Sequence, residues 1–193
     1  MLLALHVGNR RMADADILIT KLQYRLENIP LFVSDGLYFY KKALLNAYGT
    51  PGKKNHSDKR FTRPPKLVPP KELRYGQFVK TVREGKLTRS ERRSVFGTVD
   101  EKDITTSAVE RLNLTLRQEN NRISRKTIGP SRSIKHLTTH MSFYMRYYNM
   151  CRPHLSHKIR GIEYGTPAMA AGVTDEVWSI RKLLFFPYRN YVN

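Results

Sequence analysis

Cysteine, acidic residues and long apolar runs are all scarce in this sequence, and each shortage excludes a class of protein. Cys151 is the only cysteine, which excludes an internal disulfide and a cysteine-based zinc site within one chain. We expect its thiol to be buried or half-buried. No apolar stretch approaches the roughly 20 residues that a membrane-spanning helix needs, and the apolar start lacks a basic leader and a cleavage site. These features are typical of a cytoplasmic protein without a membrane partner.

Several catalytic motifs are also missing. The six histidines show no zincin-type spacing, and the sequence contains neither a Gly-rich phosphate loop nor a Gly-x-Ser-x-Gly elbow. With these motifs missing, metal-bound carboxylates remain as a possible basis for catalysis.

Basic residues, by contrast, are abundant. The chain has 35 Lys and Arg against 16 Asp and Glu, which gives a formal net charge of +19. A field of that sign concentrates polyanions around the protein. Nucleic acid is therefore the first partner to consider.

The 193 residues, 40% of them apolar, are enough to bury one sizeable core. Short apolar runs at 2–7 and 31–33 predict strands, and amphipathic periodicity at 12–28 and 37–48 predicts helices, the second closed by Gly49. Strand, helix, strand, helix is typical of an α/β fold.

Further along, the composition predicts a basic loop within 50–75 and a hairpin within 76–99 around Gly85. Two more helices are expected at 106–120 and 131–149, and a last short helix from Thr174 through Leu183. We therefore divide the chain into a core of 1–150 and a tail of 151–193. At helical spacing, the aromatic side chains are expected to pack in the core rather than stack on bases; they are Tyr144, Tyr147, Tyr148 and Trp178.

Asp35 is the first candidate site residue. It follows the apolar run 31–33 directly, so its carboxylate would project at the carboxyl edge of the sheet, where open α/β folds place ligand sites. That position makes it a candidate metal ligand. The alternative is structural, because Asp-Gly is a turn dipeptide and Asp35 could cap the following helix.

Glu110 is the second candidate. At 100° per residue, Glu110, Asn113 and Arg117 share one polar ridge of the helix, which could hold a metal at one end and a phosphate at the other. Its alternative is also structural, because Ser107 and Glu110 have the spacing of a capping box. Two carboxylates of this kind suit a pair of Mg²⁺ ions in phosphodiester chemistry.

A basic cluster follows the Glu110 helix and would contact phosphates, adding salt-dependent affinity without sequence preference. Its alternative is a solvated basic face. The cluster consists of Arg122, Arg125, Lys126, Arg132 and Lys135.

Taken together, these segments resemble a known family. The strings Phe-Val-Ser-Asp-Gly at 32–36, Glu-Arg-Leu-Asn-Leu-Thr-Leu-Arg at 110–117 and Arg-Lys-Thr at 125–127 occur in an order and spacing similar to the DDE transposases of the insertion-sequence-one group. Val-Phe-Gly at 95–97, Arg-Pro-His at 152–154 and Thr-Pro-Ala at 166–168 extend the likeness over nearly the whole chain.

The resemblance implies a ribonuclease-H-like fold, a mixed sheet flanked by helices, with Asp35 and Glu110 as the second and third metal-binding acids and Arg117 near transposon-end DNA. It also implies Mg²⁺ or Mn²⁺ as cofactor, cleavage at the element's ends, and strand transfer into target DNA. Family members act as multimers, so a homodimer or association with an intact transposase is expected.

The first aspartate of the family's triad would fall a few residues upstream of Met1, on a central strand that the chain would lack. Asp14 and Asp16 are better interpreted as first-turn acids of the helix at 12–28. We therefore expect a truncated, inactive transposase. The alternatives are a non-catalytic DNA-binding protein that competes with the intact enzyme, and a basic RNA-binding protein.

Overall fold

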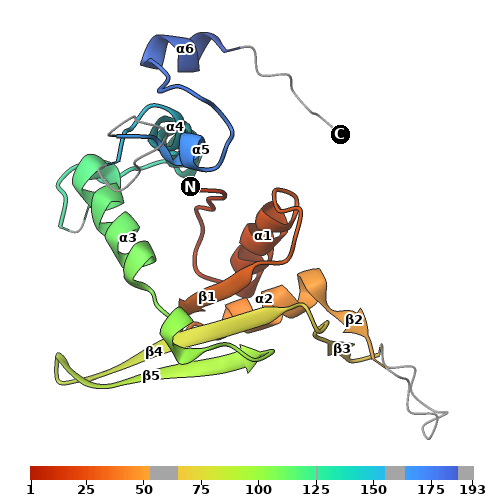
Figure 1. Cartoon of the computed structure of the whole chain (residues 1–193). Helices are drawn as coiled ribbons and strands as arrows, with labels where there is room; N and C mark the ends of the chain where they lie inside the picture. Colours follow the sequence, from red (N-terminus) through yellow and green to blue (C-terminus); the bar gives the residue numbers. More distant parts are fainter. Residues whose placement is uncertain (53–64, 125, 155–163, 187–193) are drawn as a thin grey trace, which may run out of the picture. The chain divides into compact units, whose positions relative to one another are not determined.

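The computed structural model of the chain describes residues 1–52, 65–124, 126–154 and 164–186. It forms two compact units, which we describe separately (Figure 1). The sheet unit is Gly8–Pro130, and the helical unit combines Met1–Val7 with Ser131–Asn193. The compact units thus meet at residues 7/8 and 130/131, whereas the sequence-based division lies at residue 150.

The sheet unit is built on a mixed three-stranded sheet of order β1-β4-β5. Strand β1 (Leu31–Asp35) runs parallel to β4 (Arg74–Arg83), which pairs antiparallel with β5 (Lys86–Phe96). A separate short ladder joins β2 (Thr50–Pro51) to β3 (Leu67–Val68). The predicted α/β class, with a mixed sheet flanked by helices, is confirmed.

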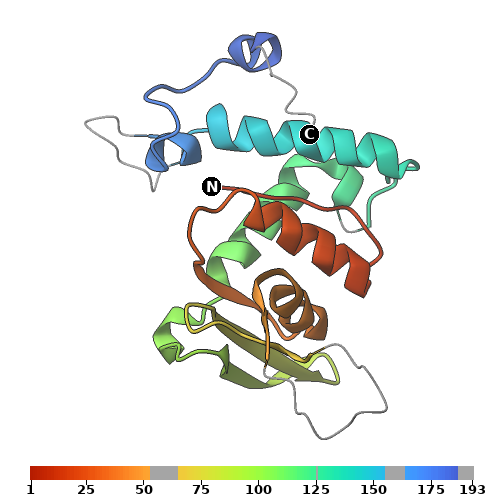
Figure 2. The ribbon, with the colours of Figure 1, turned by 90° about the vertical axis from the view of Figure 1, so that its right-hand side faces the viewer.

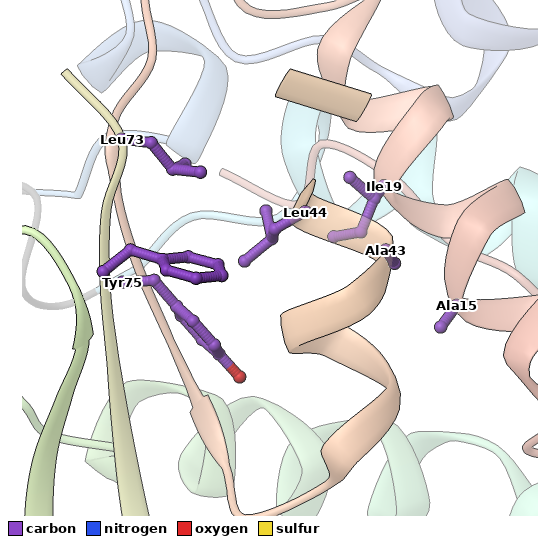
Figure 3. Packing of buried hydrophobic residues seen from close by; sticks show 7 residues of the cluster. Ala15, Ile19, Ala43, Leu44, Leu73 and Tyr75 are labelled. Atoms are coloured by element: carbon purple, nitrogen blue, oxygen red, sulfur yellow. The ribbon is translucent and has the colours of Figure 1, made fainter. Parts of the chain in front are cut away.

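Helix α2 (Tyr38–Tyr48) packs on one face of this sheet, and α1 (Met12–Gln23) packs on α2. Figure 2 shows α2 lying between α1 and the strands, and in Figure 3 Leu44 of α2 lies between Tyr75 of β4 and Ile19 of α1. The buried cluster consists of Ala15, Ile19, Ala43, Leu44, Leu73, Tyr75 and Phe96.

Helix α2 matches its prediction, whereas α1 is shorter than the predicted 12–28. The backbone N–H of Tyr24 still makes a helical bond to the carbonyl of Thr20, whereas that of Arg25 donates to the carbonyl of Leu22, three residues back, and the chain turns there. Tyr24 is 87% exposed. The apolar spacing continues past this turn, where Leu26 and Ile29 are half-buried without being helical.

Of the two acids expected in the first turn of α1, only Asp14 lies there. Asp14 accepts hydrogen bonds from the backbone N–H groups of Asn9 and Arg11, at 3.1 and 2.9 Å, which satisfies donors at the helix start. Asp16 accepts from the Asn46 side chain at 3.0 Å and so links α1 to α2.

The predicted hairpin around Gly85 is confirmed as β4 and β5. Glu84 and Gly85 have φ values of 51° and 77°, the two consecutive left-handed residues that a two-residue hairpin turn of type I′ requires. Arg83 and Lys86 are the first pair after the turn. Part of the predicted basic loop, residues 53–64, lies outside the described residues.

Three helical segments follow β5 in the sheet unit: η1 (Glu101–Asp103), α3 (Ser107–Glu119) and η2 (Asn121–Ile123). Ile104, between η1 and α3, is 1% exposed, and a Cβ added at Gly76 of β4 would lie only 2.7 Å from its Cγ1. The connection into α3 therefore packs directly on the sheet backbone.

The helical unit contains α4 (Ile134–Met150), α5 (Pro167–Ala170) and α6 (Ile180–Phe185). Helix α4 matches its prediction, but the last helix begins at Ile180 rather than Thr174. Ser179 caps it by accepting from the backbone N–H of Lys182 at 3.1 Å, which fixes the later start.

The predicted strand at 2–7 is wrong, since these residues are irregular. The Asn149 carboxamide accepts from the Leu2 backbone N–H and donates to the Leu2 carbonyl, both at 2.8 Å. A side chain of α4 thus satisfies the backbone groups that a neighbouring strand would otherwise pair.

Aromatic residues of the helical unit support the packing interpretation. Tyr144 is buried and its ring contacts those of Tyr147 and Tyr148. Trp178 donates from its indole N–H to Thr174. The Cys151 thiol is half-buried, and burial raises its pKa. In the part of the chain that the structure describes, no helix is long and apolar enough to cross a membrane.

Candidate functional site

Asp35 is the last residue of β1 and its Cα pairs in register with Phe78 of β4. Residues paired across neighbouring strands project to the same face of a sheet, and side chains two residues apart on one strand share a face. Asp35, Phe78 and Lys80 therefore lie on one face. Tyr75 belongs to the opposite face, which α2 covers.

Glu110, in the first turn of α3, reaches the same face through Lys80. The Lys80 Nζ donates to Glu110 Oε1 at 2.5 Å, with the two side chains 40% and 55% exposed. Thr106 Oγ1 also donates to Glu110 Oε1, at 3.0 Å. Strand alternation thus assigns Asp35 to this face, and the ion pair attaches Glu110 to it. The Asp35 charge also acts on the other side of the strand end, where it raises the pKa of Tyr75 and of Tyr40 after their burial.

The ion pair sets the protonation of Glu110. The hydrogen bond from Lys80, and after it the one from Thr106, lowers the pKa of Glu110 below its ordinary value. While Lys80 holds it, the Glu110 carboxylate is therefore ionised over a wider pH range, and a cation that displaced Lys80 would also remove the main cause of the lowered pKa.

The Asp35 carboxylate is held by the backbone. Its Oδ1 accepts from the Leu37 N–H at 3.2 Å, a local turn bond of the kind that Asp residues make. The N-cap position of α2 is Leu37, not Asp35. Asp35 also influences Tyr40, whose pKa is raised by burial and then by the Asp35 charge. Of the two structural alternatives for Asp35, the turn contact is therefore present, and the helix cap is not.

A capping box does not explain Glu110. The N-cap of α3 is Thr106, and Ser107 is already the first helical residue. Ser107 Oγ instead hydrogen-bonds Thr105 Oγ1, at 2.9 Å. The capping-box alternative is therefore wrong in its residues, because the helix begins one position earlier than the Ser107–Glu110 spacing assumed.

Below the end of β1, three polar side chains form a network that the sequence did not reveal. Tyr75 Oη lies 2.7 Å from Ser34 Oγ and accepts from Gln77 Nε2 at 2.8 Å. Tyr75 is only 1% exposed, so these bonds are protected from water. They fix the strand position immediately before Asp35.

Lys80 is the other site residue that sequence reasoning missed. Its Nζ lies 5.2 Å from the centre of the Phe78 ring, and the Arg92 guanidinium lies 5.3 Å from the same ring. Arg92 also donates from Nε to the Ile104 carbonyl, at 3.0 Å. A basic residue two positions after Phe78 on the predicted strand was the available signal, since period-two alternation places both on one face.

Carboxylate oxygens suit hard cations such as Mg²⁺, so Asp35 and Glu110 are the residues that could hold one. Among the described residues, no group of three or more His, Cys, Asp or Glu side chains could hold a metal ion. Any site formed here relies on two acids, one of which already has Lys80 as its cationic partner.

The predicted DNA-contacting residues are divided between the two units. Asn113 is exposed and Arg117 half-buried on α3. Arg122 and Lys126 are exposed after α3, with Lys126 at a φ of 57°. Arg125 lies outside the described residues. Two further exposed basic residues belong to the helical unit; they are Arg132 and Lys135.

Comparison of the chain with protein-family models, with curated proteins and with solved structures found no match.

Proposed function

We propose that this chain is a DDE-type transposase chain with a ribonuclease-H-like core, in which Asp35 and Glu110 bind Mg²⁺ or Mn²⁺ next to bound DNA. The observation that supports the proposal is the strand register, because it assigns Asp35 at the end of β1 to the sheet face on which Lys80 holds Glu110. The net charge of +19 supports DNA as the partner.

A bound divalent cation would supply stabilisation of the attacking and leaving oxygens in phosphodiester cleavage. Asp35 would hold its carboxylate at the rim of β1, oriented by the Leu37 N–H. Glu110 would have to exchange Lys80 for the cation, so we expect metal binding to be weak.

Mn²⁺ binding to the full chain, followed by calorimetry or electron paramagnetic resonance, tests this proposal. Asp35→Asn and Glu110→Gln should each weaken Mn²⁺ binding by about tenfold or more, because each removes one charged oxygen ligand. Glu27→Gln, an exposed acid outside the site, is the matched control and should bind as the unaltered chain does. Equal binding by all four proteins would overturn the metal site.

A non-catalytic DNA-binding protein is the second candidate. One observation favours it: Glu110 is already neutralised by Lys80, and no third ligand stands near among the described residues. In that case Asp35→Asn and Glu110→Gln leave DNA affinity unchanged, and no Mg²⁺-dependent nicking of supercoiled DNA occurs. Nicking that disappears in both variants would exclude this candidate.

A further inference from the structure

The outer half of the hairpin is a two-stranded ribbon without a third strand. Pairing with β1 ends at Phe78, so the backbone of Val79–Arg83 of β4 pairs only with Lys86–Glu91 of β5, and the Lys80 side chain holds Glu110 of α3. Figure 1 shows the hairpin tip projecting past the arrowhead of β1. At about 3.4 Å per residue, the five residues of β4 in this ribbon extend roughly 17 Å.

The hairpin is strongly basic. From Arg74 to Phe96, both included, the hairpin has seven basic side chains and two acidic ones, Glu84 and Glu91. Glu91 is shared by two arginines, since Arg93 and Arg89 lie 2.6 and 3.6 Å from its carboxylate oxygens. The basic residues are Arg74, Lys80, Arg83, Lys86, Arg89, Arg92 and Arg93.

At the tip, two like charges face each other. Arg83 and Lys86 are directly paired across the ribbon and both are exposed. Neither forms an ion pair with any of the residues that the structure describes. Like charges directly opposite each other destabilise a ribbon, so stability alone does not account for this pair.

We propose that this ribbon enters the major groove of duplex DNA, with Arg83 and Lys86 contacting phosphates at its tip. The proposal deepens the proposed function and rests on its claim that the partner is DNA. The major groove of B-form DNA, about 12 Å wide and 8.5 Å deep, admits a two-stranded β-ribbon. The major groove of A-form RNA is too narrow.

The ribbon also adjoins the candidate acids. Lys80 belongs to the ribbon and holds Glu110, so DNA seated on the ribbon lies next to the sheet face that bears both carboxylates. This surface is distinct from the basic cluster that follows α3.

The experiment measures binding of a labelled DNA duplex by fluorescence anisotropy during a NaCl titration, in EDTA so that metal binding has no influence. The double variant Arg83→Gln/Lys86→Gln should weaken binding by about tenfold or more in moderate salt. Its plot of log affinity against log salt should be shallower by about 2, since each phosphate contact contributes about 0.9. Removing the like-charge pair should leave thermal stability unchanged or slightly raised.

The matched control, Lys42→Gln/Lys71→Gln, removes the same charge from exposed positions elsewhere in the sheet unit and should keep the original slope. Equal slopes for the two double variants would overturn the ribbon proposal while leaving DNA as the partner. Tighter binding of duplex RNA than of duplex DNA would also overturn it. Failure of the unaltered chain to bind DNA would instead overturn the proposed function itself.

A purely protective role of the basic tip, which keeps exposed strand edges from pairing with other chains, has a different signature. In that case Arg83→Gln/Lys86→Gln causes self-association in sedimentation and leaves the salt dependence of DNA binding unchanged, which contradicts the proposal.

Discussion

At the scale of single residues, Lys80 has the largest influence on the pKa of Glu110. We predict that Lys80→Met raises the pKa of Glu110 toward its ordinary value, because the main cause of its lowering is the hydrogen bond from Lys80. The bond from Thr106 remains, so the return is incomplete. A carboxyl-carbon NMR titration measures the change. Lys102→Met, which breaks an ion pair with Asp100 elsewhere, should leave the titration of Glu110 unchanged.

The sign of the associated pH dependence follows from the same lowered pKa. A carboxyl whose pKa is lowered by folding stabilises the protein above its ordinary pKa, and this contribution is lost as the pH falls through the lowered value. Any difference in unfolding free energy between the unaltered chain and Lys80→Met should therefore be present at neutral pH and disappear in acid. A difference that grew in acid would contradict the assignment.

The Tyr75 hydroxyl is the second residue whose contribution is testable. Tyr75→Phe should lower the free energy of unfolding by about 1–2 kcal/mol, because partly buried Ser34 and Gln77 each lose a hydrogen-bond partner. Urea denaturation measures it. Tyr38→Phe, at a position 68% exposed, is the control and should change stability by only a few tenths of a kcal/mol. Equal losses would mean that the network contributes nothing.

At the scale of elements, the approach of the η1–α3 connection to β4 depends on Gly76. We predict that Gly76→Ala lowers the free energy of unfolding by about 1–3 kcal/mol through overpacking, since its Cβ would lie 2.7 Å from Ile104 Cγ1. Adding Ile104→Ala should cost less than the sum of the two single changes. Denaturation of all three variants measures this coupling.

Gly129→Ala is the control for that series, because a Cβ there meets nothing within 4 Å. It should leave stability unchanged. If Gly76→Ala and Ile104→Ala proved strictly additive, the close contact between strand and connection would be refuted.

Elements with strong local signals were predictable from the sequence. The helix predicted at 37–48, the hairpin around Gly85 and the strand predicted at 31–33, which continues through Asp35, each combine periodicity with a turn residue. The prediction of a strand at 2–7 was wrong, because apolar composition does not indicate what the backbone bonds to. Its partner at Leu2 is the Asn149 side chain. The predicted end of α1 was wrong because the exposure of Tyr24 and Arg25 depends on the tertiary structure, which local sequence does not reveal.

The candidate site was predictable only in part, for the same reason. Asp35 and Glu110 could be chosen from their positions after a strand and on a helix ridge. Their common sheet face depends on the β1–β4 register and on Lys80, and a register between strands about 40 residues apart has no local signature. Strand alternation could assign Lys80 to the face of Phe78, but no motif distinguishes it from the other basic residues of the hairpin as the partner of Glu110.

At the scale of the whole molecule, Asn149 joins segments 147 positions apart in the chain. We predict that Asn149→Ala speeds hydrogen–deuterium exchange in residues 1–7 and lowers the stability of the helical unit by about 1–2 kcal/mol, since two hydrogen bonds to Leu2 are lost. Mass spectrometry of the peptide covering these residues measures the exchange.

Asn46→Ala is the control, because it removes a side-chain bond to Asp16 within the sheet unit. It should not change exchange in residues 1–7. If Asn149→Ala left that exchange unchanged as well, the attachment of Leu2 to α4 would be refuted.

The helical unit combines the first seven residues with the last third of the chain, and this has a consequence for biosynthesis. Chains emerge from the ribosome beginning with their N-terminal residues, and compact parts fold as they become available. All residues of the sheet unit, Gly8–Pro130, are translated before α4. The apolar residues 1–7 have to wait until α4 has been translated, and during that interval they are a natural target for chaperones.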